Sequence, residues 1–187
     1  MKNDFNMCPQ CGSRKIQNKN NRKWLCPECG FDLYCNVAAA VGVIICDSTN
    51  HILLEVRAKE PRKGFLALPG GFVDPDERAE EAVKRECLEE IGAEVGNIQF
   101  LCSFPNTYEY KNIEYKTCDL FFTAQLKEQS DTIESVIQKL HAQESEVQGF
   151  VSVSADSEEE INKIPLAFES ARNTLLCWIK SRKNSKK

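Results

Sequence analysis

The feature that most constrains this chain is a Gly-Gly turn, Gly70-Gly71, that leads into a stretch with three glutamates at helical spacing. On a helical wheel of about 100° per residue, Glu86 and Glu90 fall inside the apolar stripe and Glu89 lies at its edge. Two carboxylates on a buried face lose hydration and repel each other, so the pattern calls for a bound divalent cation. The stripe consists of Ala79, Ala82, Val83 and Cys87.

Length and composition set the broad class of the protein. The 187 residues allow one full core and a small appendage, and the net charge of −4 gives no general attraction to nucleic acid or acidic membranes. The N-terminal residues contain no apolar stretch typical of a secretory signal, and the longest apolar run, 37–46, is too short to span a bilayer. We therefore expect a cytoplasmic protein without a membrane partner.

Four of the ten cysteines form two Cys-x-x-Cys pairs separated by 14 residues. Each pair contains a proline and precedes a glycine, which is typical of the tight knuckles that hold structural zinc. A redox Cys-x-x-Cys is the alternative, but two matched knuckles in a segment with very few aliphatic residues favour zinc. The expected Zn²⁺ ligands are Cys8, Cys11, Cys26 and Cys29.

The rest of the chain alternates between strand and helix patterns. We expect residues 1–34 to depend on metal because they cannot bury a core, and the first two strands after them to form a hairpin. The segment 127–143 is either a helix or a mobile insertion, and residues 180–187 are predicted to be a basic, frayed tail. Strands are predicted over 37–46, 51–57, 65–68, 98–104, 115–126 and 149–154, and helices over 77–91 and 168–180.

The glycine, glutamates and arginine of the central segment form one motif: Gly71, five residues, Glu77, seven residues, Arg85-Glu86, two residues, Glu89-Glu90, one residue, Gly92. This chain therefore resembles the Nudix hydrolases, whose box it matches at every fixed position. The resemblance implies an α/β fold, a Nudix-type α/β/α sandwich with a mixed sheet, preceded here by a small zinc ribbon. The expected division is a ribbon over 1–34, a Nudix hydrolase domain over 36–180 and a basic tail over 181–187.

The resemblance also implies the activity. Nudix enzymes use Mg²⁺ or Mn²⁺ to hydrolyse a nucleoside diphosphate linked to another group, by attack of water on phosphorus. By position, Glu86 and Glu90 would be the main metal ligands, Glu89 would join a second ion, and the Gly70 carbonyl would add an oxygen. The general base would be a box glutamate or a later acid, Glu144 or Glu146. The residues expected to be catalytic are Glu77, Arg85, Glu86, Glu89 and Glu90.

Nudix proteins with a ribbon in front resemble the NADH pyrophosphatases and their ADP-ribose-hydrolysing relatives. That subgroup carries a Ser-Gln-Pro-Trp type of motif after the box, whereas this chain has Ser103-Phe104-Pro105-Asn106. The difference argues against assigning NADH specificity. The expected partner is a small nucleoside diphosphate derivative, with NADH-like dinucleotides and ADP-ribose-like sugar nucleotides as the two candidate classes.

The segment after the box carries the candidate substrate-binding residues. The side chains of Asn106, Tyr108 and Tyr110 would lie beside the box, where a tyrosine face stacks on a base and an amide reads its edge. A hairpin with cross-strand tyrosine pairs is an equally good interpretation. Arg57, at the end of the second strand, is a candidate phosphate ligand.

A rival function is a metabolite sensor that keeps the Nudix fold without catalysis and contacts nucleic acid through its ribbon. Basic residues and Trp24 lie between the two knuckles, although a solubilising loop with Trp24 packed on a core is the favoured interpretation. Sensors often lose box carboxylates, and this box keeps all of them. A homodimer remains an open alternative to a monomer.

Overall fold

The computed structural model describes residues 4–127 and 132–184 of the chain. The N-terminal part is a small antiparallel sheet in the order β1-β2-β3. Trp24 is buried at 6% exposure and packs edge-on against Phe5, with 5.3 Å between ring centroids. Its ring therefore serves the ribbon's own packing, as the favoured interpretation predicted. The strands are β1 (Gln17–Lys19), β2 (Lys23–Leu25) and β3 (Asp32–Tyr34).

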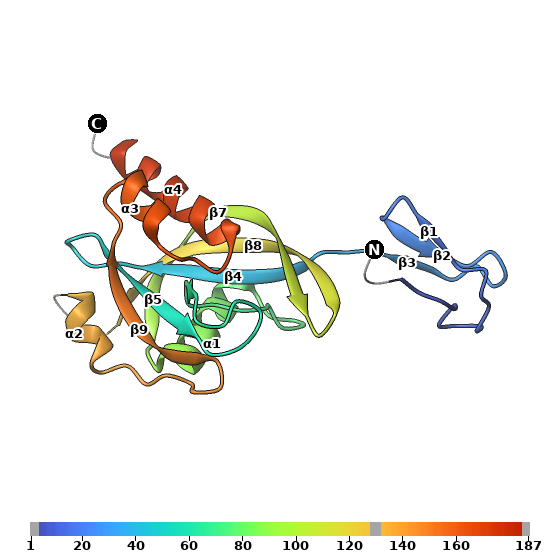
Figure 1. Ribbon diagram of the computed structural model, residues 1–187, viewed down its shortest axis with the longest axis horizontal. Coiled ribbons are helices and arrows are strands. Elements are labelled where there is room, and N and C mark those ends of the chain that lie inside the picture. The colour runs from blue at the N-terminus through green and yellow to red at the C-terminus, as the bar shows by residue number, and fades with distance from the viewer. Residues whose placement is uncertain (1–3, 128–131, 185–187) are drawn as a thin grey trace.

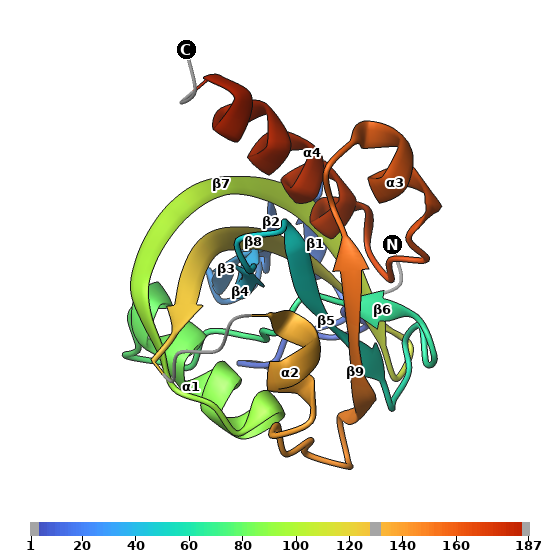
Figure 2. The same ribbon diagram turned by 90° about the vertical axis from the view of Figure 1, so that its left-hand side faces the viewer.

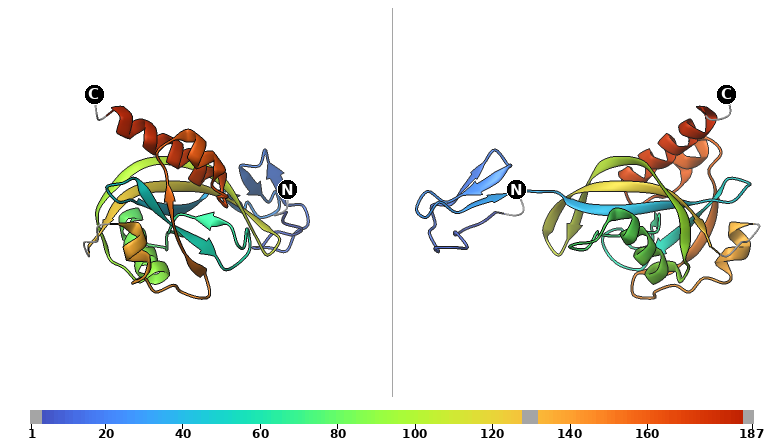
Figure 3. Two further views of the ribbon diagram at one scale, coloured as in Figure 1. Left: turned by 60° about the vertical axis from the view of Figure 1, so that its left-hand side comes forward. Right: turned by 180° about the vertical axis from the view of Figure 1, so that it is seen from behind.

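The chain runs from the ribbon directly into the first strand of the larger part. The ribbon itself lies to one side of the sheets of that part (Figures 1 and 3). Two three-stranded sheets form that part, β4-β8-β7 and β6-β5-β9. The first is mixed, because β4 runs parallel to β8 while β7 and β8 are antiparallel. The strands are β4 (Ala38–Ile45), β5 (His51–Arg57), β6 (Leu66–Ala67), β7 (Val95–Tyr110), β8 (Ile113–Leu126) and β9 (Val147–Ser154).

The expected hairpin between the first two strands is wrong. The chain does turn over residues 47–50, where Asp47 Oδ1 accepts hydrogen bonds from two backbone N–H groups. After the turn the strands separate into different sheets and share only the bridge between Cys46 and Ile52. The continuous apolar run of β4 is buried on both faces, so it suits a parallel partner that a short turn cannot supply.

Helices cover both sides of the sheets, which gives the expected α/β/α layers (Figures 1 and 2). One core packs α1 and α2 against β4 and β5, with Leu53, Val83 and Ile133 among its members. The other packs α3 and α4 against β5 and β8, and Leu175 lies within it. The helices are α1 (Ala79–Ile91), α2 (Ile133–Ile137), α3 (Glu158–Lys163) and α4 (Glu169–Asn184).

The helices other than α1 extend the sequence predictions at three places. The segment 127–143 contains α2, although residues 128–131 lie outside the described part of the chain. The helix α3 was not predicted, yet Ser157 and Glu160 form a capping box at its start. The last helix runs to Asn184 rather than ending at residue 180, because Arg182 stacks on Trp178 at 4.5 Å. None of the helices in the described ranges has the length and apolar character needed to cross a membrane.

Replacing Leu175 with alanine tests the packing that holds α4 in place. Leu175 is completely buried, so Leu175→Ala should lower the free energy of unfolding by about 2–5 kcal/mol through lost burial and a residual cavity. Leu88 is more than half exposed on α1, and Leu88→Ala should change stability by less than about 0.5 kcal/mol. Denaturant unfolding measures both, and equal losses would contradict the packing described here.

Candidate functional site

The Gly70-Gly71 turn brings backbone directly against the glutamates of α1. Gly70 has φ of 143°, and its N–H donates to Glu90 Oε2 at 2.8 Å. A Cβ at Gly70 would collide with the Val41 carbonyl oxygen, and one at Gly71 would lie 2.5 Å from Glu86 Oε1. Gly70 therefore needs glycine for its backbone conformation and its contact with the Val41 backbone, whereas a side chain at Gly71 would displace the Glu86 carboxylate.

The three box glutamates lie where the helical wheel predicts. Glu86 and Glu90 are buried on the inner face of α1, at 8% and 5% exposure. Glu89 lies at the edge, with half of its side chain exposed. Two carboxylates therefore share one water-poor surface beside the glycine turn.

Arg85 binds the turn to the helix. Its guanidinium donates to both oxygens of Glu77 at 2.9 Å, and Nη2 also donates to the Phe72 carbonyl at 3.0 Å. Nη1 donates to Glu86 at 2.8 Å and to Glu89 at 3.2 Å. The hydrogen bonds from Arg85 lower the pKa of Glu77. Glu77 and Arg85, both expected at the site, therefore form an ion pair that joins the turn to the helix.

The two inner carboxyl groups have raised pKa values, although Glu86 forms an ion pair with Arg85. Burial raises the pKa of Glu90 to about 8, although the hydrogen bond from the Gly70 N–H lowers it. The negative charges of Glu86 and Glu146 add to the increase. Burial likewise raises the pKa of Glu86, although Arg85 opposes it. A nearby divalent cation would favour the ionised forms of both groups.

A fourth acid, Glu55, lies beneath this group and was missed by the sequence analysis. It is 3% exposed, and its Oε2 atom is buried without a hydrogen-bond partner. Burial, followed by the charge of Glu90, raises its pKa well above the ordinary value. The available signal was a single glutamate inside the apolar strand 51–57.

The oxygen-rich donor set suits Mg²⁺ or Mn²⁺, with Glu86, Glu89 and Glu90 as carboxylate ligands and the Gly70 carbonyl as a fourth candidate. In the described ranges, however, only the cysteines of the ribbon place three or more candidate ligand atoms within 4.8 Å of one another. The box acids are spread more widely, and the Arg85 guanidinium holds two of them.

A cavity of about 370 Å³ opens beside these acids. Arg57, Asn106 and Tyr108 line it as predicted, together with the box residues. Tyr110 does not, because it lies in a separate hollow near the β7–β8 turn with Lys111 5.1 Å from its ring. The structure therefore places three of the four predicted substrate-binding residues at one cavity.

Aromatic rings form one wall of this cavity. Tyr108 contacts Phe72 edge-on at 5.5 Å and Phe168 at 5.8 Å, and Arg57 lies 5.2 Å from the Phe168 ring. Tyr108 is also the cross-strand partner of Tyr115, so the hairpin with a cross-strand tyrosine pair is present. Phe168 was missed as a site residue, because nothing in the sequence shows that the start of the last helix faces the box.

Of the two later acids that are candidates for the general base, one lies at the cavity and the other does not. Glu146 lines the cavity and forms an ion pair with Lys59 at 2.5 Å. Glu144 is exposed and does not line it.

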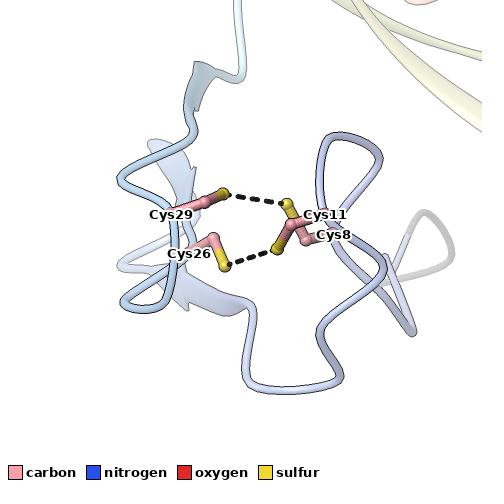
Figure 4. A group of neighbouring side chains, drawn as sticks. All are labelled: Cys8, Cys11, Cys26 and Cys29. Carbon is pink, nitrogen blue, oxygen red and sulfur yellow. Dashed lines mark hydrogen bonds between the residues drawn. The ribbon is translucent and has the colours of Figure 1, made fainter.

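The four cysteines of the ribbon point their sulfur atoms toward one another (Figure 4). The Cys8–Cys29 and Cys11–Cys26 sulfurs are both 3.7 Å apart, close to the roughly 3.8 Å edge of a zinc–thiolate tetrahedron with 2.3 Å bonds. Burial opposes ionisation of Cys26, but the N–H groups of Cys29 and Glu28 outweigh it and lower the pKa of Cys26 to about 7. The cluster therefore fits structural zinc.

The family assignment follows from this fold and site. Residues 37–173 match the model of the NUDIX domain, so the chain belongs to the Nudix family.

Among curated relatives, the NAD-capped RNA hydrolase NudC of Vibrio vulnificus is 34% identical over 105 residues, which are 56% of this chain and 40% of the relative. The ADP-ribose pyrophosphatase of Methanocaldococcus jannaschii is 46% identical over 80 residues, 43% of each chain. The chain thus spans about two fifths of the length of these relatives. A crystal structure of a NUDIX hydrolase from Nitrosomonas europaea shares the fold, with a TM-score of 0.64, 24% identity and coverage of 95% of this chain and 92% of that one.

The stability of the metal-free protein should fall as pH rises. Glu90 has a pKa of about 8 in the folded state against 4.5 ordinarily, so folding favours its protonated form, and this stabilisation is lost as pH rises toward 8. We expect the thermal midpoint in chelator to decrease between about pH 5 and pH 8. Glu90→Gln should flatten this slope, while Glu80→Gln, at an exposed position on α1, should keep it. A midpoint that rises over this interval would contradict the assigned burial.

The ribbon should hold about one zinc per chain, as four thiolates imply. Removing the metal should expose the amides of residues 8–35 to hydrogen exchange while leaving the two sheets protected, since the cores of the sheets contain no ribbon residue. Elemental analysis and exchange mass spectrometry measure the two effects. A zinc-free ribbon with unchanged protection would rule the site out.

Proposed function

We propose that the protein is a metal-dependent pyrophosphohydrolase that acts on a nucleoside diphosphate linked to another group. The observation that carries this proposal is the joint burial of Glu86 and Glu90 against the Gly70-Gly71 backbone at one cavity. In the reaction, water attacks one phosphorus and the bridging P–O bond breaks. The attacked phosphate keeps the hydroxyl group of the water and the leaving phosphate takes the proton, so that two phosphomonoesters form.

Two basic side chains of the cavity are suited to the diphosphate. Arg57 Nη2 is buried without a hydrogen-bond partner, although Nε donates to the Pro61 carbonyl at 3.0 Å. A buried unpaired donor is costly, and a phosphate oxygen would satisfy it. Lys59, paired with Glu146 at the same cavity, supplies a second positive charge.

Glu86, Glu89, Glu90 and the Gly70 carbonyl would hold Mg²⁺ or Mn²⁺. When bound, the metal supplies charge neutralisation for the phosphates and lowers the pKa of water. Arg85 fixes the turn and positions Glu86 by direct hydrogen bonds. Glu146 is the stronger candidate for the general base because it lines the cavity, whereas Glu144 does not.

The proposed substrate classes are ADP-ribose-like sugar nucleotides and NADH-like dinucleotides. Support comes from the relatives named for ADP-ribose and for NAD-capped RNA, and from the aromatic wall at Tyr108 and Phe168. A nucleic acid enters this proposal only as a substrate that carries such a dinucleotide.

We further propose that residues 1–34 form a structural zinc ribbon and that the catalytic unit extends from residue 36 to the end of α4. A cytoplasmic location is supported by the ten cysteines, none of which forms a disulfide, as expected in a reducing compartment.

Glu90→Gln tests the proposal while preserving the side-chain volume. The substitution should lower kcat by more than about a hundredfold, because a charged ligand worth several kcal/mol of transition-state stabilisation is lost. Glu80→Gln, exposed on the same helix, should keep full activity. The assay is a panel of nucleoside diphosphate derivatives with Mg²⁺ or Mn²⁺, with products separated by chromatography.

Unchanged turnover in Glu90→Gln would refute the assigned site. A wild-type protein that binds members of the panel without converting any of them would instead support the sensor hypothesis.

A further inference from the structure

A second polar group lines the same cavity on the wall formed by β8 and α4, away from the box helix. It consists of Thr117 and Asp119 on β8 and Ser170 on α4, all between 3% and 7% exposed. Thr117 and Asp119 are two residues apart on one strand, so their side chains lie on the same face. The proposed hydrolysis does not use these residues.

Hydrogen bonding within this group leaves it able to accept hydrogen bonds but not to donate them. The Thr117 hydroxyl donates to Asp119 Oδ1 at 2.6 Å, and the Ser170 hydroxyl donates to Oδ2 at 2.7 Å. Each hydroxyl has one hydrogen, which is now committed, while every oxygen of the group keeps a lone pair. The group can therefore accept hydrogen bonds from a ligand but has no side-chain donor left to offer one.

The lack of a free donor limits which ligand groups this wall of the cavity can bind. An anionic phosphate is repelled by the Asp119 carboxylate, and a ligand carbonyl finds only acceptors. A ligand N–H or O–H group, by contrast, would meet a buried charged acceptor, where a hydrogen bond contributes more than at the surface. The phosphates of a substrate are thus directed toward Arg57 and Lys59 instead.

The neighbouring side chains suit a planar ring. Phe168 lies two residues before Ser170, and Tyr108 packs at 5.8 Å from it with 39° between the ring planes. Asn106 is the cross-strand partner of Thr117 and lines the same cavity. Aromatic faces beside an acceptor-only edge favour a heterocycle that carries an amine.

We propose that Asp119, held by Thr117 and Ser170, binds the exocyclic amine of the substrate's adenine and favours it over a purine that lacks this amine. The inference rests on the proposed function, in that it assigns the nucleoside part of the same substrate. It names a substrate-binding residue that discriminates between bases, separate from the residues assigned to the chemistry.

The test compares adenine with unsubstituted purine, which lacks the amine and gains no ring N–H. Calorimetry with AMP and purine riboside monophosphate, which contain no pyrophosphate bond, measures binding without catalysis, and kcat/KM for ADP-ribose and its purine analogue measures selection during turnover. Wild type should favour the adenine compound at least about tenfold in both, because a buried acceptor left without its donor is strongly disfavoured. Asp119→Asn, which removes the charged acceptor, should reduce the preference to less than about threefold.

Asp156→Asn is the matched control, at an exposed aspartate on the loop before α3, and should keep the wild-type preference. Equal treatment of the two bases by wild type would overturn the inference while leaving hydrolysis established. A preference for adenine that Asp119→Asn retains, with a lower thermal midpoint, would assign Asp119 a structural role only and also overturn it. Tenfold selection by AMP binding in a protein that converts no substrate would uphold the inference and refute the hydrolase proposal.

Loss of affinity on removing the 2′- or 3′-hydroxyl of the ribose, with no loss on removing the amine, would place a ribose hydroxyl at Asp119 and overturn the assignment of the amine. Failure of both AMP and purine riboside monophosphate to bind would overturn it as well.

Discussion

The structure depends on the contact between the inner face of α1 and the glycine backbone that precedes it. Glu90 accepts a hydrogen bond from the Gly70 N–H, and Glu86 fills the space that a side chain at Gly71 would need. Arg85 then binds the turn to the helix through Glu77 and Phe72. Because these carboxylates are buried, their repulsion is relieved only by protonation or by a cation. The same contact therefore shapes the loop and specifies the chemistry.

The sheets place two kinds of wall around one cavity. The box helix supplies acids suited to a metal, and β8 with the start of α4 supplies Asp119, Ser170 and an aromatic ring. Arg57, at the end of β5, stacks on Phe168 and keeps a buried donor free. A molecule with a diphosphate at one end, facing the metal site and Arg57, and an amine-bearing ring at the other, facing Asp119, matches these walls. The N-terminal ribbon, with its cluster of four cysteines, adds none of its described residues to the cavity.

Local patterns in the sequence were enough to predict the box helix, its two buried glutamates and the cysteine knuckles. Each of these depends on residues close together in the chain, where helical periodicity or ligand spacing acts directly. Pairing between distant segments was not predictable in the same way, and the first two strands were wrongly joined as a hairpin. Glu55, Phe168 and Asp119 were missed as site residues for a related reason, because their roles arise only when β5, β8 and α4 meet around the cavity.

The most direct test of the central claim is a crystal structure of the protein soaked in Mn²⁺, with the metal located by its anomalous scattering. The account predicts a peak bounded by carboxylate oxygens of Glu86 and Glu90 and by the Gly70 carbonyl, with oxygen distances of about 2.0–2.3 Å. Occupancy of the ribbon alone, with both glutamates still as they are in the metal-free chain, would contradict it.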